Sequence, residues 1–365
     1  MLVLAALLLN SRVERSALRV EYVEPDFTYK PPGVFFSDDF NAPPRDYFEF
    51  DQAKESFAWT MQVGMNSTGA MKATWSPKQV NAGNLKVLFG RNPFNKGVQT
   101  DRTFREIFWR VYVKNEPGWE GDPAKFARVT CLGGEDWSQG LFAHVWSGKN
   151  HALCIDPATG IQDDKKVTTK YNDFDHMKWL GSVDGKTPIF TPAESGRWIC
   201  VECQVKLNNP GAEDGAFQLW VDGKLEAAKT KLNWHGKWEE FGINAFFLEN
   251  YWNDGAPKKE SRYFEELALG TRRIGPLASP PNPIIHVTDT SQEWVVQVGD
   301  DPYGESAVWT SRPMPVGADS VAVHSKMGKF EPSKAIKLEP GAYWVRVRRN
   351  SQSQWSPWHS PFVVK

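Results

Sequence analysis

The sequence has few cysteines, no excess of charge of either sign and one short apolar run at its start. Its 365 residues include four cysteines, 43 basic and 44 acidic residues, which leaves a formal net charge of −1 at pH 7. A chain with this balance has no global field that would draw it to nucleic acid or to an anionic membrane surface. The apolar run, MLVLAALLLN at residues 1–10, is too short to cross a bilayer. We therefore expect no nucleic-acid partner and no membrane span; the oligomeric state is left open.

A clean helical period is also missing, and the abundant residues favour strands and turns. No long segment repeats its apolar residues about every 3.6 positions, whereas the chain has 17 tryptophans, 22 phenylalanines, 29 glycines and 25 prolines. Aromatic side chains fit the pleated surface of a sheet, and glycine and proline mark turns. The composition therefore predicts an all-β protein.

The apolar run resembles the hydrophobic region of a secretory signal peptide. It lacks a basic region before it and a clear small-x-small cleavage site after it. We interpret residues 1–20 as a truncated signal segment, which predicts a secreted, extracellular or periplasmic protein. The alternative is a packed or frayed N-terminal segment.

The four cysteines do not indicate a metal site. Cys200 and Cys203 have the spacing of zinc ligands, but they lie in RWICVECQVKL, whose alternation is typical of a strand. Residues three apart on a strand point to opposite faces, so these thiols are not expected to share a metal. Cys131 and Cys154 could form a disulfide in an exported protein, or all four could be plain buried thiols. Spacing alone leaves both alternatives open.

Motifs for cofactors and for several classes of enzyme are absent as well. The sequence has no GxGxxG, no phosphate-binding loop, no GxSxG and no HExxH. The acidic stretch DPATGIQDDKK, residues 156–166, lacks the spacing of a known calcium loop and is better explained as a solvated turn. We expect no cofactor, and no motif supports a structural calcium ion.

Strand-like segments separated by turn residues extend from GVFFSDDF, residues 33–40, to YFEELALGTRRIG, residues 263–275. So many strands without helical crossovers predict a two-sheet sandwich or jelly roll. VDGK, residues 221–224, places Asp-Gly at a tight hairpin turn. PLASPPNP, residues 276–283, predicts a stiff linker, and residues 284–365 have the length of a second, smaller sandwich.

The last strands of that smaller region resemble the end of a fibronectin type III domain. In LEPGAYWVRVRRNSQSQWSPWHSPFVV, Leu338, Pro340 and Tyr343 match a family pattern in which a tyrosine hydroxyl fixes a corner of the fold. The resemblance implies an immunoglobulin-like sandwich that acts as a spacer or adhesion unit, and we assign it no chemistry.

The larger region resembles the concanavalin A-like jelly rolls over about residues 33–275. FFSDDF is similar to the first strand of that family, RWICVECQVKLNNPGAEDGAFQLWVDGK to an internal hairpin, and RYFEELALGTRRIG to the closing strand. Polysaccharide lyases with this fold carry a strand similar to FREIFWRVYVKNEPGW. The resemblance implies a carbohydrate-active or carbohydrate-binding jelly roll.

The strand EIFWRVYVK, residues 106–114, alternates between an apolar face and a face of charged and aromatic residues. The second face holds Phe108, Arg110, Tyr112 and Lys114, with Glu106 placed to hold a neighbouring arginine. In the resembling folds one sheet forms a groove for an extended sugar chain, where cations bind carboxylates and aromatic rings bind sugar faces. We interpret this face as part of such a groove; an ordinary outer face is the alternative.

Two further segments repeat the aromatic and polar pattern. In GLFAHVW, His144 and Trp146 share a face with Phe142, and in INAFFLENYW Asn250 and Tyr251 lie on opposite sides of a strand. A single histidine is usually structural. His144 is a candidate because it recurs beside aromatic residues.

The chemistry that these residues favour is β-elimination. The hydrolase signature of this scaffold, ExDxxE on one strand, is absent, so the paired carboxylates that hydrolysis needs are not evident. Elimination needs a cation to neutralise a uronate, a base, and a proton donor for the leaving oxygen. We assign the first role to Arg110, the second to His144 or Tyr112, and the third to Tyr112. Binding of neighbouring sugars is assigned to Arg105, Glu106, Phe108, Lys114, Trp146, Asn250 and Tyr251.

The sequence thus predicts a secreted polysaccharide lyase that cleaves an extracellular, uronate-containing polysaccharide. The alternative is a carbohydrate-binding or adhesion protein that uses the same sheet without cleaving its ligand, because lectins and hydrolases share the scaffold.

Overall fold

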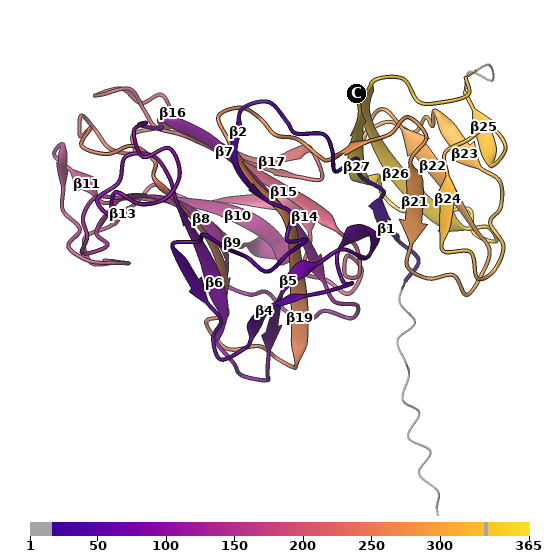
Figure 1. Cartoon of the computed structure of the whole chain (residues 1–365), viewed down its shortest axis with the longest axis horizontal. Helices are drawn as coiled ribbons and strands as arrows, with labels where there is room; N and C mark the ends of the chain where they lie inside the picture. Colours follow the sequence, from indigo (N-terminus) through magenta and orange to yellow (C-terminus); the bar gives the residue numbers. More distant parts are fainter. Residues whose placement is uncertain (1–16, 332–334) are drawn as a thin grey trace, which may run out of the picture.

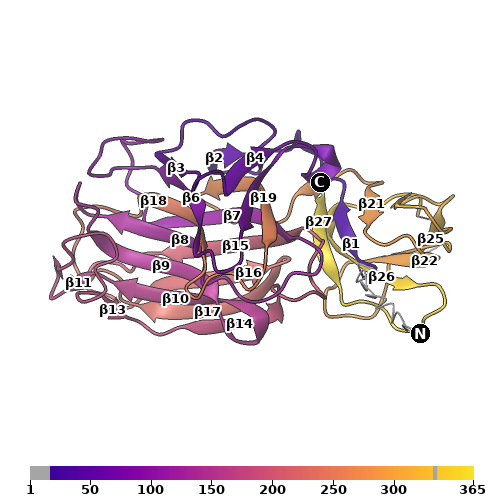
Figure 2. The same ribbon diagram turned by 90° about the horizontal axis from the view of Figure 1, so that it is seen from below.

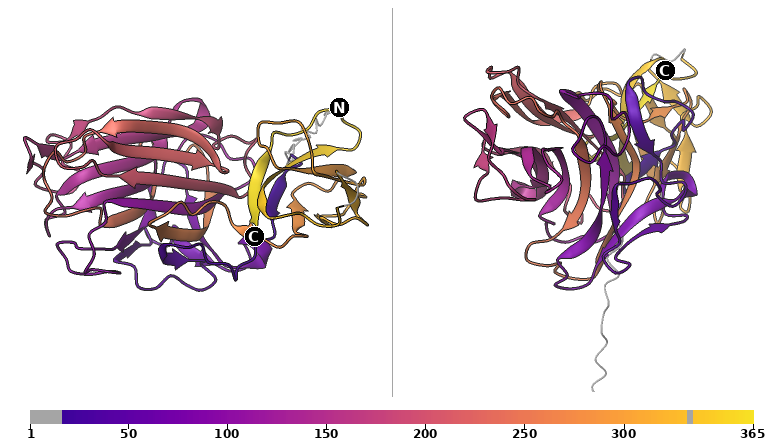
Figure 3. Two further views of the ribbon diagram at one scale, coloured as in Figure 1. Left: turned by 90° about the horizontal axis from the view of Figure 1, so that it is seen from above. Right: turned by 60° about the vertical axis from the view of Figure 1, so that its left-hand side comes forward.

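The computed structural model describes residues 17–331 and 335–365, which form an all-β protein built around a jelly-roll β-sandwich. Residues 1–16 of the proposed signal segment lie outside the described residues, whereas its last residue, Val20, is buried at the start of strand β1 (Val20–Val23), so the bound at residue 20 is wrong. Two sandwiches lie end to end along the long axis of the molecule (Figure 1). Figure 3 shows the same arrangement from two other directions.

The first sheet of the large sandwich, here the β7 sheet, has eight strands. Its spatial order is β17 (Lys224–Leu232), β16 (Gly215–Val221), β15 (Ile199–Lys206), β7 (Glu106–Asn115), β19 (Glu260–Gly270), β5 (Ala70–Trp75) and β4 (Phe57–Thr60), and β2 (Val34–Asp38) also pairs with β19. Each pairing is antiparallel, which suits strands joined by hairpins and loops rather than by helices.

The second sheet, here the β8 sheet, also has eight strands. Its spatial order is β13 (Lys178–Trp179), β10 (Ala152–Thr159), β9 (Gln139–Ser147), β8 (Lys125–Leu132), β18 (Ala245–Tyr251), β6 (Asn81–Leu88) and β3 (Glu49–Asp51), and β14 (Val183–Pro188) also pairs with β10. Figure 2 shows β8, β9 and β10 side by side. The remaining elements of the large sandwich are the hairpin β11 (Ile161–Gln162) and β12 (Lys165–Lys166) and the short 3₁₀ turns η1 (Met65–Ser67) and η2 (Lys149–His151).

The core of the large sandwich lies between these two sheets. Trp109 and Val111 of β7 and Ala143 and Val145 of β9 belong to the same buried cluster. The Trp109 ring lies 5.3 Å from that of Phe246, a residue of β18 in the opposite sheet. Side chains alternate along a strand, so Arg110 of β7 points away from the core on the outer surface of the β7 sheet. His144 of β9 points away from the core on the outer surface of the β8 sheet, on the opposite side of the sandwich.

The hairpin prediction is confirmed, and the turn prediction for the acidic stretch is correct only at its centre. Val221 pairs with Lys224, and Asp222 and Gly223 between them have φ of 49° and 74°, as a two-residue hairpin of this hand requires. Asp163 and Asp164 form an exposed turn between β11 and β12, whereas residues 157–161 of the acidic stretch are buried and mostly belong to strands.

All four cysteines are free and buried, so the disulfide alternative is wrong. Cys131 lies in the core, whereas the Cys154 thiol contacts the carbonyl of Ser147 at 3.6 Å on the outer side of its strand. Cys203 lies in the core and Cys200 in a cluster on the outer side, as the alternation of their strand predicts.

The small sandwich packs a three-stranded sheet against a six-stranded sheet. The first is β1 (Val20–Val23), β21 (Ile284–Val287) and β24 (Ser320–Ala322); the second is β20 (Ala278–Ser279), β27 (His359–Val364), β26 (Gly341–Arg349), β22 (Trp294–Gly299), β23 (Trp309–Ser311) and β25 (Gly328–Phe330). The Tyr343 hydroxyl donates a hydrogen bond to the Glu339 carbonyl at 2.8 Å. The resemblance of this region to fibronectin type III domains stays a prediction.

The small sandwich contains strands from the sequence before the large sandwich as well as from the sequence after it. β1, before the jelly roll in sequence, pairs with β21, with Val20 opposite Val287 (Figure 1). β20, inside the proposed linker 276–283, pairs in parallel with β27. The jelly roll is therefore inserted after the first strand of the small sandwich, and the linker is partly a strand.

A buried ion cluster stabilises the large sandwich where it meets the small one. The Arg197 guanidinium, 1% exposed, donates to Asp222 at 2.7 Å and to Glu194 at 2.8 Å. The indole of Trp344, in the small sandwich, donates to the Asp222 carbonyl at 3.0 Å. The hairpin turn at Asp222 thus joins the two sandwiches.

Candidate functional site

Most of the outer face of β7 is covered by the protein itself, and Arg110 and Lys114 line two separate pockets rather than the predicted continuous groove. The Tyr112 hydroxyl accepts a hydrogen bond from the Leu277 amide at 2.9 Å, and burial raises the pKa of this phenol well above its usual range. Arg110, 3% exposed, donates to the Gly275 carbonyl at 3.1 Å and pairs with Glu266 at 3.3 Å. The segment that leads to the small sandwich, which includes Gly275 and Leu277, therefore packs on these two side chains and is hydrogen-bonded to them.

The other predicted residues of this strand also have partners within the chain. Lys114 pairs with Glu21 at 2.9 Å, Glu106 accepts from the Gln204 amide, and Phe108 packs against Trp220. Arg105, just before the start of β7, pairs with Glu239 at 2.8 Å. The alternation correctly predicts which residues share a face, but it carries no information on what lies over that face.

We expect the Tyr112→Phe variant to unfold more easily and to keep its function. The substitution leaves the Leu277 amide without its acceptor and should lower the free energy of unfolding by about 1–3 kcal/mol. Urea denaturation measures the stability, and the elimination assay described below measures activity. A large loss of turnover in folded protein would return Tyr112 to the active site.

His144 lies on the other sheet and cannot act together with Arg110 and Tyr112. The three residues point outward from opposite sides of the sandwich, since β7 and β9 belong to different sheets and face each other through the core. Asn250 points into the core, where its amide oxygen accepts from Arg262 at 2.9 Å. The predicted grouping is therefore wrong. His144, Trp146 and Tyr251 remain together on the outer face of the β8 sheet.

On that face, six adjacent strands each contribute one residue to a continuous line, here the cross-strand row. In spatial order the row is Glu49, Lys86, Phe247, Arg128, His144 and Asp156. Neighbouring strands lie about 4.8 Å apart, so the row spans roughly 24 Å. The register of the sheet thus places two cations and a histidine between terminal carboxylates.

Arg128 is the centre of the contacts within the row. One guanidinium nitrogen donates to the Asn172 amide oxygen at 2.5 Å, and another donates to the Tyr171 hydroxyl and, at 3.0 Å, to Glu249. Arg128 is 1% exposed, and its Nε has no hydrogen-bond partner among the described residues. A guanidinium held in this way is presented as a planar donor suited to a carboxylate.

His144 is held as a neutral imidazole beside that guanidinium. Its Nδ1 lies 3.2 Å from the Asp156 carbonyl, and because a carbonyl only accepts, Nδ1 carries the hydrogen and Nε2 has the free lone pair. Burial, and then the charge of Arg128, hold the pKa of His144 well below its usual value. The ring lies 4.4 Å from that of Trp146 and 5.7 Å from that of Trp179. At neutral pH the residue is therefore an unprotonated base.

Tyr171 supplies a phenol at the same place. Burial raises the pKa of Tyr171 to about 12, an effect that Arg128 opposes, so the hydroxyl keeps its proton at neutral pH. The hydroxyl also approaches Glu249 at 3.5 Å. The face therefore holds a guanidinium, a neutral imidazole and a protonated phenol, which are the three groups that elimination from a uronate needs.

Aromatic side chains from two loops and from the short edge strand β13 cover much of the row. Trp137 lies over the Lys86 ammonium at 4.8 Å, Tyr171 lies over Arg128, and Trp179 stacks on Phe174. Trp137 has a φ of +64°, which is rare for a bulky residue and is found where surroundings hold a strained backbone. Trp179 is 43% exposed although His144 beneath it is 1% exposed.

Sequence reasoning missed Arg128, Lys86, Glu249 and Tyr171. Arg128 lies in KFARVTCL, where a single cation follows an irregular alternation; the register there shifts between Lys125 and Ala127. Tyr171 lies in a loop outside any periodic segment. A signal for Arg128 was present, because a lone arginine in a buried strand needs a partner.

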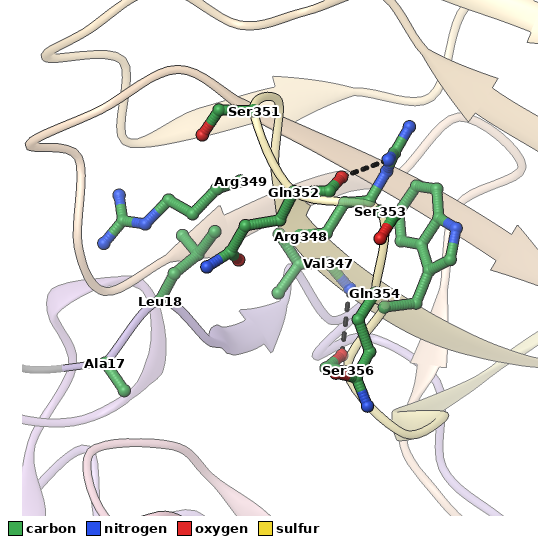
Figure 4. Close-up of a pocket in the computed structure, with 11 residues that line it drawn as sticks. Ala17, Leu18, Val347, Arg348, Arg349, Ser351, Gln352, Ser353, Gln354 and Ser356 are labelled. Atoms are coloured by element: carbon green, nitrogen blue, oxygen red, sulfur yellow. Dashed lines mark hydrogen bonds between the residues drawn. The ribbon is translucent and has the colours of Figure 1, made fainter.

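A cavity of about 670 Å³ lies elsewhere, on the small sandwich (Figure 4). Its lining includes Arg348, which donates to the Gln352 carbonyl, and the hydroxyl of Ser356, which accepts from the Val347 amide at 3.0 Å. Its walls contain no histidine or tyrosine, so the groups for proton transfer are not gathered there.

Residues 17–331 and 335–365 contain neither a cluster of metal-binding side chains nor a membrane-spanning helix. No group of three or more histidine, cysteine or acidic side chains in these ranges could hold a metal ion. None of the helical turns in the same ranges has the length and apolar character needed to cross a membrane.

No protein-family model and no curated protein matches this sequence. Among solved structures, the chain is similar to an endo-β-1,4-glucuronan lyase from the fungus Trichoderma reesei, at 15% identity and a TM-score of 0.47, over 66% of this chain and 96% of that one. It is similar to a marine alginate lyase from Aplysia kurodai at 12% identity and a TM-score of 0.47, over 66% and 99%. An alginate lyase from a Chlorella virus has 13% identity and a TM-score of 0.42, over 62% and 100%. The site residues are accordingly assigned from the geometry of this chain alone.

Proposed function

We propose that this protein is a secreted lyase that cleaves an acidic polysaccharide by β-elimination on the outer face of the β8 sheet. The observation that carries the proposal is the register that sets Arg128 beside His144, with the Tyr171 hydroxyl bonded to the same guanidinium. The site moves from the sheet that the sequence suggested to the opposite one, while the kinds of residue stay the same.

The three residues divide the reaction between them. Arg128, with the Asn172 amide beside it, binds the uronate carboxylate and makes the proton on the adjacent carbon more acidic. His144 Nε2 removes that proton, and the electron pair forms the new carbon–carbon double bond. The bond to the leaving oxygen breaks, and Tyr171 gives this oxygen its proton. Solvent then returns the proton on His144 to the tyrosine.

The flanking aromatic residues bind the rest of the chain. Trp146 and Tyr251 point outward beside the row, and Lys125 lies over the Tyr251 ring at 4.5 Å. Such rings offer flat apolar faces to sugars. Because Trp137 and Trp179 cover the row, the loop that carries Trp137 and the edge strand β13 that carries Trp179 must move before a sugar reaches His144.

An elimination assay tests the proposal. Purified protein is incubated with a panel of soluble uronate-containing polysaccharides, and the ultraviolet absorbance of the unsaturated uronate product is followed. A rise in absorbance that depends on the protein supports the lyase. Binding on an affinity gel with no rise would instead support a carbohydrate-binding protein.

The pH dependence of the reaction should show the unusual state of His144. Its pKa lies well below the ordinary value for histidine, so the ring stays neutral, and able to act as a base, as the pH falls below that value. We expect kcat/KM to stay nearly level from neutral pH to below about 6 and to fall only at lower pH. A half-maximal rate at the ordinary histidine pKa would contradict this environment for His144.

A further inference from the structure

We infer that the site selects a polysaccharide in which acidic sugars are separated by neutral ones, and that an unbroken polyuronate is a poorer substrate. The inference rests on the proposed function and concerns the substrate class of the same site. It follows from the distribution of charge over the outer face of the β8 sheet.

The two cations of the cross-strand row already have carboxylate partners. Lys86 pairs with Glu49 of the neighbouring strand, and Arg128 pairs with Glu249 at 3.0 Å. Lys86 is also enclosed by the rings of Trp137 at 4.8 Å and Phe247 at 5.3 Å. An acidic sugar that binds one of these cations therefore competes with a carboxylate of the protein.

The strand residues of this face carry no surplus of positive charge. Its cations are Lys86, Lys125, Arg128 and Lys186, and its carboxylates are Glu49, Asp51, Asp156, Asp184 and Glu249. Exposed charges attract a polyanion from a distance only when one sign prevails. The face is therefore built to exchange single carboxylates and not to concentrate a polyanion.

The ends of the row oppose further acidic sugars. Glu49 lies one strand beyond Lys86, and Asp156 lies two strands beyond Arg128. Asp156 is partly buried, and this desolvation raises the pKa of its carboxyl, an effect that the charge of Lys229 opposes. In the direction along the strands, the next row on one side is Thr130, Phe142 and Ala158, which is uncharged. When a sugar carboxylate is bound at Arg128, most positions where the next sugar could lie are therefore next to uncharged or negatively charged side chains.

A graded series from one polymer tests this. The probe is a soluble polyuronate that the protein cleaves, with increasing fractions of its carboxylates reduced to primary alcohols, so that linkage and length stay constant. We expect kcat/KM to rise as the first carboxylates are removed, to reach a maximum at an intermediate fraction, and then to fall as target uronates are lost. We also expect KM for the optimal polymer to change little with ionic strength.

The Glu49→Gln variant provides the matched comparison. It removes the carboxylate at one end of the row and frees Lys86, so KM for the fully acidic polymer should fall by about fivefold, as expected when one partly screened repulsion is removed. The maximum should shift toward more acidic polymers. A steady fall in kcat/KM from the fully acidic polymer, with a steep salt dependence, would overturn the inference and leave the lyase intact. Absence of product with every polymer would overturn the proposed function, and the inference with it.

Discussion

The His144→Gln and Tyr171→Phe variants should each lose about 10²- to 10⁴-fold in turnover while still binding the polysaccharide. General acid–base groups typically contribute this much, because they act mainly in the transition state. Glutamine can still donate to the Asp156 carbonyl, and phenylalanine keeps the ring that lies over Arg128. The measurements are kcat from the absorbance assay and binding from affinity electrophoresis.

The control for both variants is Tyr112→Phe, which removes a buried tyrosine hydroxyl from the opposite sheet. It should keep wild-type turnover. If His144→Gln and Tyr171→Phe also keep full turnover on a confirmed substrate, the outer face of the β8 sheet is not the catalytic site. If they lose binding as well as turnover, the two residues contribute to binding the substrate before the reaction and not mainly to stabilising the transition state.

The Arg197→Met variant should lose about 3–5 kcal/mol of unfolding free energy, because it leaves the buried carboxylate of Asp222 without its cation. Arg197 bonds both Asp222 and Glu194, and Asp222 is 3% exposed. Guanidinium denaturation with an unchanged slope would measure the loss. Adding Asp222→Asn to this variant should recover part of it, since the second change removes the unpaired charge.

The matched control is Lys149→Met, which removes the cation of an exposed pair. Lys149 is 82% exposed in its side chain and lies 3.6 Å from Asp184. Exposed pairs typically contribute about 0.2–1 kcal/mol, so this variant should be close to wild type. Equal effects of the two substitutions would show that the cluster around Arg197 adds little at the junction of the sandwiches.

The fold could be predicted from the sequence because local patterns determine it. The alternation of EIFWRVYVK predicted correctly that Trp109 and Val111 face the core, and Asp-Gly at 222–223 predicted the hairpin. These features depend on residues close together in the chain. The jelly-roll architecture follows from many such strands with no helical crossovers.

The site could be predicted only by residue type, because its assembly depends on distant pairings. The juxtaposition of Lys86, Phe247 and Arg128 arises from the register of three strands that are far apart in sequence. What covers a face is equally non-local. The contact between Tyr112 and Leu277 joins positions 165 residues apart, so no periodicity within EIFWRVYVK could distinguish an open groove from a covered surface.

The pairing of β1 with β21 has a consequence for the order in which the protein is made. During synthesis, Val20 and its neighbours emerge before the jelly roll, but their partners around Val287 emerge only after all of it. Domains generally fold as the chain appears, from the N-terminal end. The jelly roll can therefore be complete while β1 waits unpaired, and the small sandwich closes last. Until then β1 presents an open strand edge, the kind of surface that pairs with other chains and that chaperones protect.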